Sequence, residues 1–110
     1  MNRGMQEMSI KMFDPIHPGE HLFEDFMKPL HISQTKLASD IGVPFRRIHE
    51  IVNGKRSITA ETALFLGQYF EMSPEFWLRL QVDYDLEQEK ERLVDRLKQV
   101  RIFKRQDKIS

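Results

Sequence analysis

The chain has 110 residues, of which 40% are hydrophobic and 31% charged, a composition typical of one globular domain. It contains no cysteine, which excludes disulfides and thiolate metal sites, and no apolar run approaches the roughly 18 residues that cross a bilayer. The N-terminus lacks the pattern of a signal peptide, so we expect a cytoplasmic protein that has no membrane partner.

The formal net charge is zero, but the charges are segregated along the chain. Residues 33–58 contain five Lys or Arg residues against two acidic residues, a net charge of +3. Residues 1–32 and 59–84 carry net charges of −2 and −3, and residues 85–110 carry +2. An anionic partner is therefore attracted to residues 33–58 and repelled by the rest of the core.

The first predicted helix begins at Pro18, which fits the first helical position, and it ends at Pro29. Its apolar residues recur at helical spacing and form an apolar stripe. They are Leu22, Phe23, Phe26, Met27 and Leu30.

Two short helices joined by a tight turn are predicted within residues 33–56. Ser33 is a good N-cap for the first of these helices, and Gly42 suits the left-handed residue that ends it. Pro44 opens the second helix, which is expected to run to about Asn53. A cationic second helix presented in this way suits the major groove of duplex DNA.

Two further helices complete the predicted core. Thr59 caps the fourth helix, and Ser73, Pro74 and Glu75 supply a cap, a first-turn proline and a first-turn acid for the fifth. No segment shows a convincing strand pattern, so the chain is expected to be all-α.

The predicted domain layout has four parts. We expect a flexible leader over residues 1–14 and a helix-turn-helix domain over residues 15–84. A C-terminal helix follows over residues 85–103, and residues 104–110 form a disordered tail. Because the C-terminal helix has few apolar residues among many charges, it is expected to pair with a partner or with its own copy.

The predicted base-reading surface is the outer face of the second helix of the pair. A helical wheel that places Ile48 in the core places this face toward solvent. Arg46 is expected to donate to guanine O6 and N7, and Glu50 to accept from cytosine N4. The ring of Phe45 either touches a thymine methyl group or packs at the edge of the domain. The predicted base-reading residues are Phe45, Arg46, Arg47, Glu50 and Asn53.

Phosphate contacts are predicted around this face. Gln34 lies at the N-terminus of the preceding helix, where backbone N–H groups favour a phosphate, and Lys55 and Arg56 follow the second helix in a loop. Taken alone, each cation is explained equally well as ordinary surface charge. The group as a whole indicates DNA binding more specifically than any one of its members. The predicted phosphate-contacting residues are Gln34, Thr35, Lys36, His49, Lys55 and Arg56.

A possible enzyme motif lies at the start of the first helix, where His17-Pro18-Gly19-Glu20-His21 matches the H-x-x-E-H pattern of some metallopeptidases. That chemistry needs both histidines on one face of a regular helix. Pro18 and Gly19 instead place the motif across a helix start, where Glu20 complements the helix dipole. We therefore predict no metal site, no cofactor and no enzymatic activity.

A family resemblance supports the DNA-binding interpretation. The pattern SQTKLASDIGV, then five residues, then HEIVNGKR resembles the Xre/phage-repressor family of helix-turn-helix proteins. The blocks HPGE, NGKRSITAETA and SPEFWL, with Gln81, look like the HigA/VapI branch of antitoxins within that family. The resemblance covers roughly residues 15–86. One departure is Pro44, where many members have Ser or Thr, so no phosphate contact is expected there.

The resemblance implies a five-helix, lambda-repressor-like core, to which the C-terminal helix is an addition. It implies a homodimer that binds a palindromic operator and represses its own operon. It also implies a partner toxin of the HigB type, an mRNA-cleaving ribonuclease that the antitoxin neutralises by direct binding.

Three alternatives remain open at this point. Besides an antitoxin, they are a stand-alone Xre-type repressor without a toxin, a protein-interaction adaptor that binds through residues 85–103, and the small metallopeptidase that the helix start within its motif disfavours. The dimer interface is expected on residues 73–100. The toxin is expected to bind the N-terminal segment through the first helix, the C-terminal helix or this dimer interface.

Overall fold

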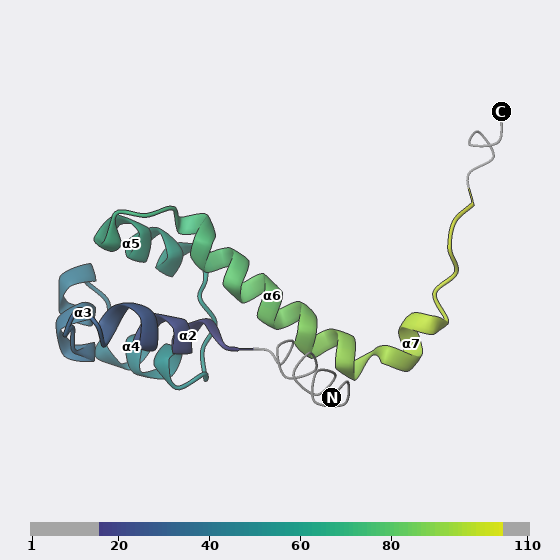
Figure 1. Cartoon of the computed structure of the whole chain (residues 1–110), viewed down its shortest axis with the longest axis horizontal. Helices are drawn as coiled ribbons and strands as arrows, with labels where there is room; N and C mark the ends of the chain where they lie inside the picture. The colour runs from purple at the N-terminus through teal and green to yellow at the C-terminus, as the bar shows by residue number, and fades with distance from the viewer. Residues whose placement is uncertain (1–15, 105–110) are drawn as a thin grey trace, which may run out of the picture.

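The computed structural model of the protein describes residues 16–104, so the predicted leader over residues 1–14 and the predicted tail beyond residue 104 lie outside the described residues. The described part of the chain contains six α-helices and one π-helical segment, and no strand. The all-α prediction is therefore confirmed. Helices α2 to α5 gather in one bundle, and α6 begins against this bundle and runs away from it (Figure 1).

The first helix is made of α2 (Pro18–His21) and the π-helical segment η1 (Leu22–Met27), which continues it without a break. Pro18 occupies the first helical position as predicted. The N-cap is His17, whose Nδ1 accepts the backbone N–H of Gly19 at 2.9 Å.

The predicted helix pair consists of α3 (Gln34–Ile41) and α4 (Phe45–Val52). Ser33 caps α3 as predicted, since its Oγ accepts the backbone N–H of the third helical residue at 3.0 Å, and Gly42 ends α3 with a φ of 76°. Pro44 does not take the first helical position that we predicted. Its ψ of 144° is extended, so it closes the turn and α4 begins one residue later.

The last predicted core helices are α5 (Ala60–Phe70) and α6 (Pro74–Arg92), and the caps expected at Thr59 and Ser73 both accept backbone N–H groups at the starts of these helices. A short α7 (Val94–Lys98) follows. With α2 and η1 taken as one helix, residues 16–104 contain the expected five-helix core and an additional C-terminal helix.

The boundary that we predicted at residue 84 falls inside α6. Residues 85–103 therefore do not form the separate helix that we predicted, because residues 85–92 belong to α6. Residues 85–92 continue α6 because they include Leu, Glu, Gln, Lys and Arg, all strong helix formers, and contain no proline or glycine. The helix breaks at Leu93, whose φ and ψ are −105° and 16°. The change in composition marks where burial ends rather than where the helix ends.

The core is formed by residues from every helix of the bundle, and two glycines permit close helix approaches. A Cβ atom on Gly19 would lie 1.7 Å from the carbonyl oxygen of Ile51, so α2 packs directly on the α4 backbone. A Cβ atom on Gly67 would lie 2.8 Å from the carbonyl oxygen of Met72. The buried apolar residues are Leu22, Met27, Leu37, Ala38, Ile48, Ile51, Ile58, Ala63, Leu66 and Trp77.

A buried glutamine ties the loop after α4 to α6. Gln81 is 5% exposed, and its Oε1 accepts the backbone N–H of Ile58 at 2.8 Å. Its Nε2 donates to the carboxylate of Asp85 at 3.0 Å. Both ends of the amide are therefore satisfied, and α4 and its following loop are held in place against α6.

Residues 85–104, which we call the C-terminal arm, project beyond the bundle (Figure 1). Most of their large apolar side chains are more than half exposed, so the arm buries little against the rest of the described chain, as we expected. These side chains are Leu86, Val94, Leu97, Val100, Ile102 and Phe103. Within residues 16–104, none of the helices has the length and apolar character needed to cross a membrane.

Candidate nucleic-acid interface

The outer face of α4 and the loop after it form one exposed polar surface, which we call the α4 surface. Ile48 and Ile51 are fully buried and fix the inner face of α4. The Arg46 side chain is 83% exposed, and a shallow groove runs beside it. This groove is lined by Arg46, His49, Glu50, Asn53 and Lys55, all of which we predicted to contact DNA.

Glu50 holds two arginines at this surface instead of presenting a free carboxylate. Its Oε2 accepts from Arg46 Nε at 3.0 Å, and its Oε1 accepts from Arg56 Nε at 2.9 Å and Nη2 at 2.8 Å. The hydrogen bond from Arg56, with that from Arg46, holds the pKa of Glu50 below its ordinary value. Both carboxylate oxygens thus already accept hydrogen bonds from arginine, and the predicted contact to cytosine N4 would use a remaining lone pair of Oε2.

His49 joins the two helices of the pair. Its Nδ1 lies 3.1 Å from Gln34 Oε1 at the start of α3, and Asn53 Nδ2 donates to its backbone carbonyl at 2.8 Å. The ring of Phe45 stacks on the imidazole with centroids 5.5 Å apart and remains 48% exposed. The side chains of Gln34, His49 and Asn53 therefore lie together.

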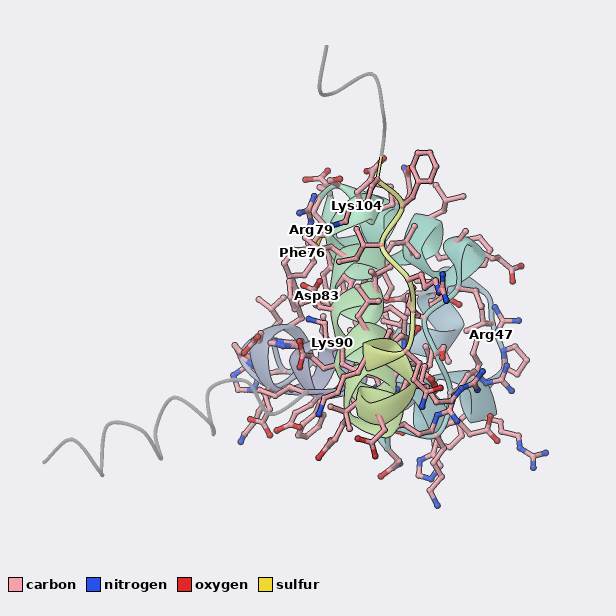
Figure 2. The ribbon with its side chains drawn as sticks, turned by 90° about the vertical axis from the view of Figure 1, so that its right-hand side faces the viewer. Arg47, Phe76, Arg79, Asp83, Lys90 and Lys104 are labelled. Carbon is pink, nitrogen blue, oxygen red and sulfur yellow. The ribbon has the colours of Figure 1, made fainter. Side chains whose placement is uncertain are left out.

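Arg47 points away from this group. Its Nη1 donates to Glu61 Oε1 of α5 at 3.1 Å, and its side chain is only 24% exposed. Figure 2 shows Arg47 on the side of the molecule opposite the row of Phe76, Arg79, Asp83 and Lys90 along α6. The structure thus pairs Arg47 with an acidic residue of another helix, which places it at the flank of the α4 surface.

Lys36 is likewise paired within the protein. Its Nζ lies 2.9 Å from Asp40 Oδ2, which also accepts from the hydroxyl of Tyr69 at 2.6 Å. The hydrogen bonds from Tyr69 and Lys36 hold the pKa of Asp40 below its ordinary value. This cluster connects α3 to α5 and leaves exposed Thr35 as the neighbouring polar residue near the start of α3.

The acidic partners of these cations were not predicted from the sequence. The Arg46–Glu50 and Lys36–Asp40 pairs have the i, i+4 spacing that favours ion pairs on a helix, so the pattern was available. The Arg47–Glu61 pair joins residues 14 positions apart on different helices, and no local spacing indicates it.

The residues of the H-x-x-E-H motif form the N-cap and the first turn of α2. His17 Nδ1 is occupied by the N-cap hydrogen bond, and its ring meets Tyr84 edge-on at 5.0 Å. His21 Nδ1 instead lies 3.0 Å from Asp25 on the next turn. Among residues 16–104, no group of three or more His, Asp or Glu side chains is arranged to hold a metal ion.

Comparisons with known proteins match this architecture. A family model described as helix-turn-helix matches residues 24–77. Virulence-associated protein I of Dichelobacter nodosus is 48% identical over 71 residues, which cover 64% of this chain and 66% of that protein. Virulence-associated protein A of the same organism is 36% identical over 92 residues, which cover 83% of this chain and 90% of that protein.

A solved structure extends the match to three dimensions. The Pseudomonas aeruginosa antitoxin HigA, solved with the higBA promoter, superposes with a TM-score of 0.76 at 34% identity. The match covers 80% of this chain and 96% of that chain. Relatives of this kind are helix-turn-helix regulators and antitoxins without enzymatic activity, and the present chain is not an enzyme. The chain belongs to the Xre-type helix-turn-helix family, among the HigA-type antitoxins and Vap-type proteins that share its core.

Proposed function

We propose that this chain is a sequence-specific DNA-binding protein that places α4 in the major groove. The observation that supports this most is the exposed Arg46, which stands on a helix whose inner face is locked by two fully buried isoleucines. A DNA complex of a relative with the same core supports it further. A rigid helix with an outward arginine is the arrangement that reads guanine in this class of fold.

The polar groups of the surface divide into two roles. Arg46 Nε is bound to Glu50, so its terminal nitrogens remain to donate to guanine O6 and N7. Lys55 lines the same groove, and Gln34 begins α3, where the first backbone N–H groups have no carbonyl partner within the helix, so both suit phosphates.

We propose that two copies associate through their C-terminal arms. Residues 85–91 contain four acidic residues and one basic residue, a net charge of −3, whereas residues 92–104 contain five basic residues and one acidic residue, a net charge of +4. Two arms packed antiparallel would place each acidic half against a basic half and cover the exposed leucines and valines. Such a dimer presents two α4 helices to a palindromic operator, about 34 Å apart.

We further propose that the protein is a cytoplasmic antitoxin. In this role it represses its own operon and neutralises a HigB-type ribonuclease toxin by direct binding. The HigA-type relatives and the three sequence blocks support this proposal. A stand-alone repressor is the alternative, and the neighbouring open reading frame separates the two, because a small basic protein of about 90 residues there favours the antitoxin.

An electrophoretic mobility shift with the DNA upstream of the gene tests DNA binding. We expect a saturable shift whose affinity falls steeply between low and high salt, since phosphate contacts release counterions. A chain that gives no salt-sensitive shift on this DNA is not the proposed repressor.

Copurification with the product of the neighbouring gene tests the antitoxin role. We expect a stable complex with the full chain and loss of the toxin's RNA cleavage within it. The same experiment on a chain ending after Arg92 shows whether α7 and the residues that follow it contribute to the contact. A neighbouring product that neither binds nor is inhibited supports the stand-alone repressor.

A further inference from the structure

A single carboxylate organises the cationic groups of the α4 surface. Glu50 binds Arg46, one turn before it on α4, and Arg56, which lies in the loop after the helix. Its side chain is 26% exposed, whereas those of Arg46 and Arg56 are 83% and 46% exposed. The carboxylate therefore lies beneath the two guanidinium groups and connects the helix to its loop.

This arrangement restricts where Arg46 points. A guanidinium has five N–H donors, and binding Nε to a carboxylate leaves the four on the terminal nitrogens directed outward. An arginine held in this way loses less side-chain freedom when it meets guanine than a free arginine does. Since bidentate contact requires one orientation, the pairing prepares Arg46 for a guanine.

The same carboxylate opposes binding to the wrong sequence. When Arg46 finds no guanine, Glu50 remains a negative charge within the α4 surface, close to the phosphates that flank the groove. Repulsion between this carboxylate and the phosphates weakens every complex, and only a duplex that gives Arg46 its guanine contact offsets the loss. Exposed ion pairs contribute little to folding, so this effect belongs to recognition rather than to stability.

We propose that Glu50 is a positioning residue that determines sequence specificity by fixing Arg46 and Arg56 over the α4 surface and by penalising DNA that offers Arg46 no guanine. The proposal rests on the DNA-binding function proposed above. It assigns Glu50 a role that differs from base contact, because it acts through its two arginines.

The test uses Glu50→Gln, which keeps the shape of the side chain and removes its charge. The matched control is Glu71→Gln in the turn between α5 and α6, which makes the same change in net charge away from the α4 surface. Fluorescence anisotropy measures the affinity of each full-length variant for two duplexes. One is the duplex that the wild-type chain selects from a random-sequence library, and the other is its scrambled version.

We expect Glu50→Gln to bind the scrambled duplex more tightly and to lower the ratio of selected to scrambled affinity by about tenfold, the size of one lost base discrimination. Glu71→Gln should leave this ratio within about twofold, since a distant charge acts on all sequences alike. In an Arg46→Ala background, Glu50→Gln should lower the ratio no further, because its target residue is absent.

A ratio that Glu50→Gln leaves unchanged, or that Glu71→Gln lowers equally, overturns the positioning role while leaving DNA binding intact. A wild-type chain that selects no sequence overturns the DNA-binding function itself. NMR of the arginine Nε–Hε groups without DNA provides a separate measurement. The signals of Arg46 and Arg56 should both move in Glu50→Gln, and two unmoved signals would show that the carboxylate does not hold them.

Discussion

Arg46 and Lys55 line the same groove but are expected to make different contacts with DNA. Arg46→Ala should weaken binding to the selected operator by about 1–3 kcal/mol and relax the preference at one base position, because a base contact is lost. Lys55→Ala should weaken binding to all sequences alike and reduce the salt slope by about 1, because a phosphate contact is lost. Salt titrations on selected and scrambled duplexes distinguish the two patterns, and the reverse pattern would contradict the assignment.

His17 gives the fold a dependence on pH. Burial lowers the pKa of His17 from its ordinary value of 6.5, although the charge of Asp85 opposes the shift. The unfolded chain then takes up this proton at a higher pH than the folded chain, so the stabilisation is complete above pH 6.5 and is lost as the pH falls below it. Protonation also removes the acceptor that caps α2.

Urea denaturation of two variants tests this role of His17. His17→Ala should lower the free energy of unfolding by about 1 kcal/mol at neutral pH, the usual cost of a lost N-cap. His17→Asn keeps a cap without a titrating ring, so it should retain most of the stability and lose the part of the pH dependence that lies below pH 6.5. An unchanged pH dependence in His17→Asn would show that another group causes it.

At the scale of elements, the position of α4 depends on its contact with α2. Gly19→Ala places a Cβ atom against the Ile51 carbonyl, so we expect a loss of about 3 kcal/mol in the free energy of unfolding. Gly42→Ala is the matched control, because its Cβ atom meets nothing within 4 Å and the change costs only the strain of its positive φ, about 1 kcal/mol. The fluorescence of buried Trp77 during denaturation measures the stability of both variants. Equal losses in the free energy of unfolding would contradict the close packing.

The boundaries of the core helices were predictable because their signals are local. Ser33, Thr59 and Ser73 each accept a backbone N–H within three residues, and such chemistry is visible in a short window of sequence. The outward direction of Arg46 followed from helical geometry alone. The turn of Arg47 toward Glu61 was not predictable, because it depends on how α4 and α5 pack.

The extent of α6 shows a different limit. Asp85 begins a charge-rich segment, and composition alone suggested a new element there. Helix propensity does not change at that position, so the helix continues to Arg92 while its burial declines. Burial depends on which neighbours are present, and the segment beyond the bundle has few among the described residues.

At the scale of the whole molecule, the C-terminal arm links the proposed dimer to the spacing of the operator. Replacing Arg96 and Lys98 by Glu should weaken the dimer, because the basic half of each arm then repels the acidic half of its partner. Adding Glu87→Lys and Glu91→Lys to the same chain should restore it. Sedimentation velocity at low salt measures the fraction of dimer in both variants. A fraction that none of the four substitutions changes would place the interface elsewhere.

The central claim is that α4 reads guanine in the major groove of two operator half-sites. Methylation interference tests it directly, because a methyl group on guanine N7 blocks the acceptor that Arg46 is proposed to bind. We expect methylated guanines to prevent binding in two clusters, about one turn of DNA apart, and Arg46→Ala to remove this sensitivity. Binding that tolerates methylation at every guanine would contradict it.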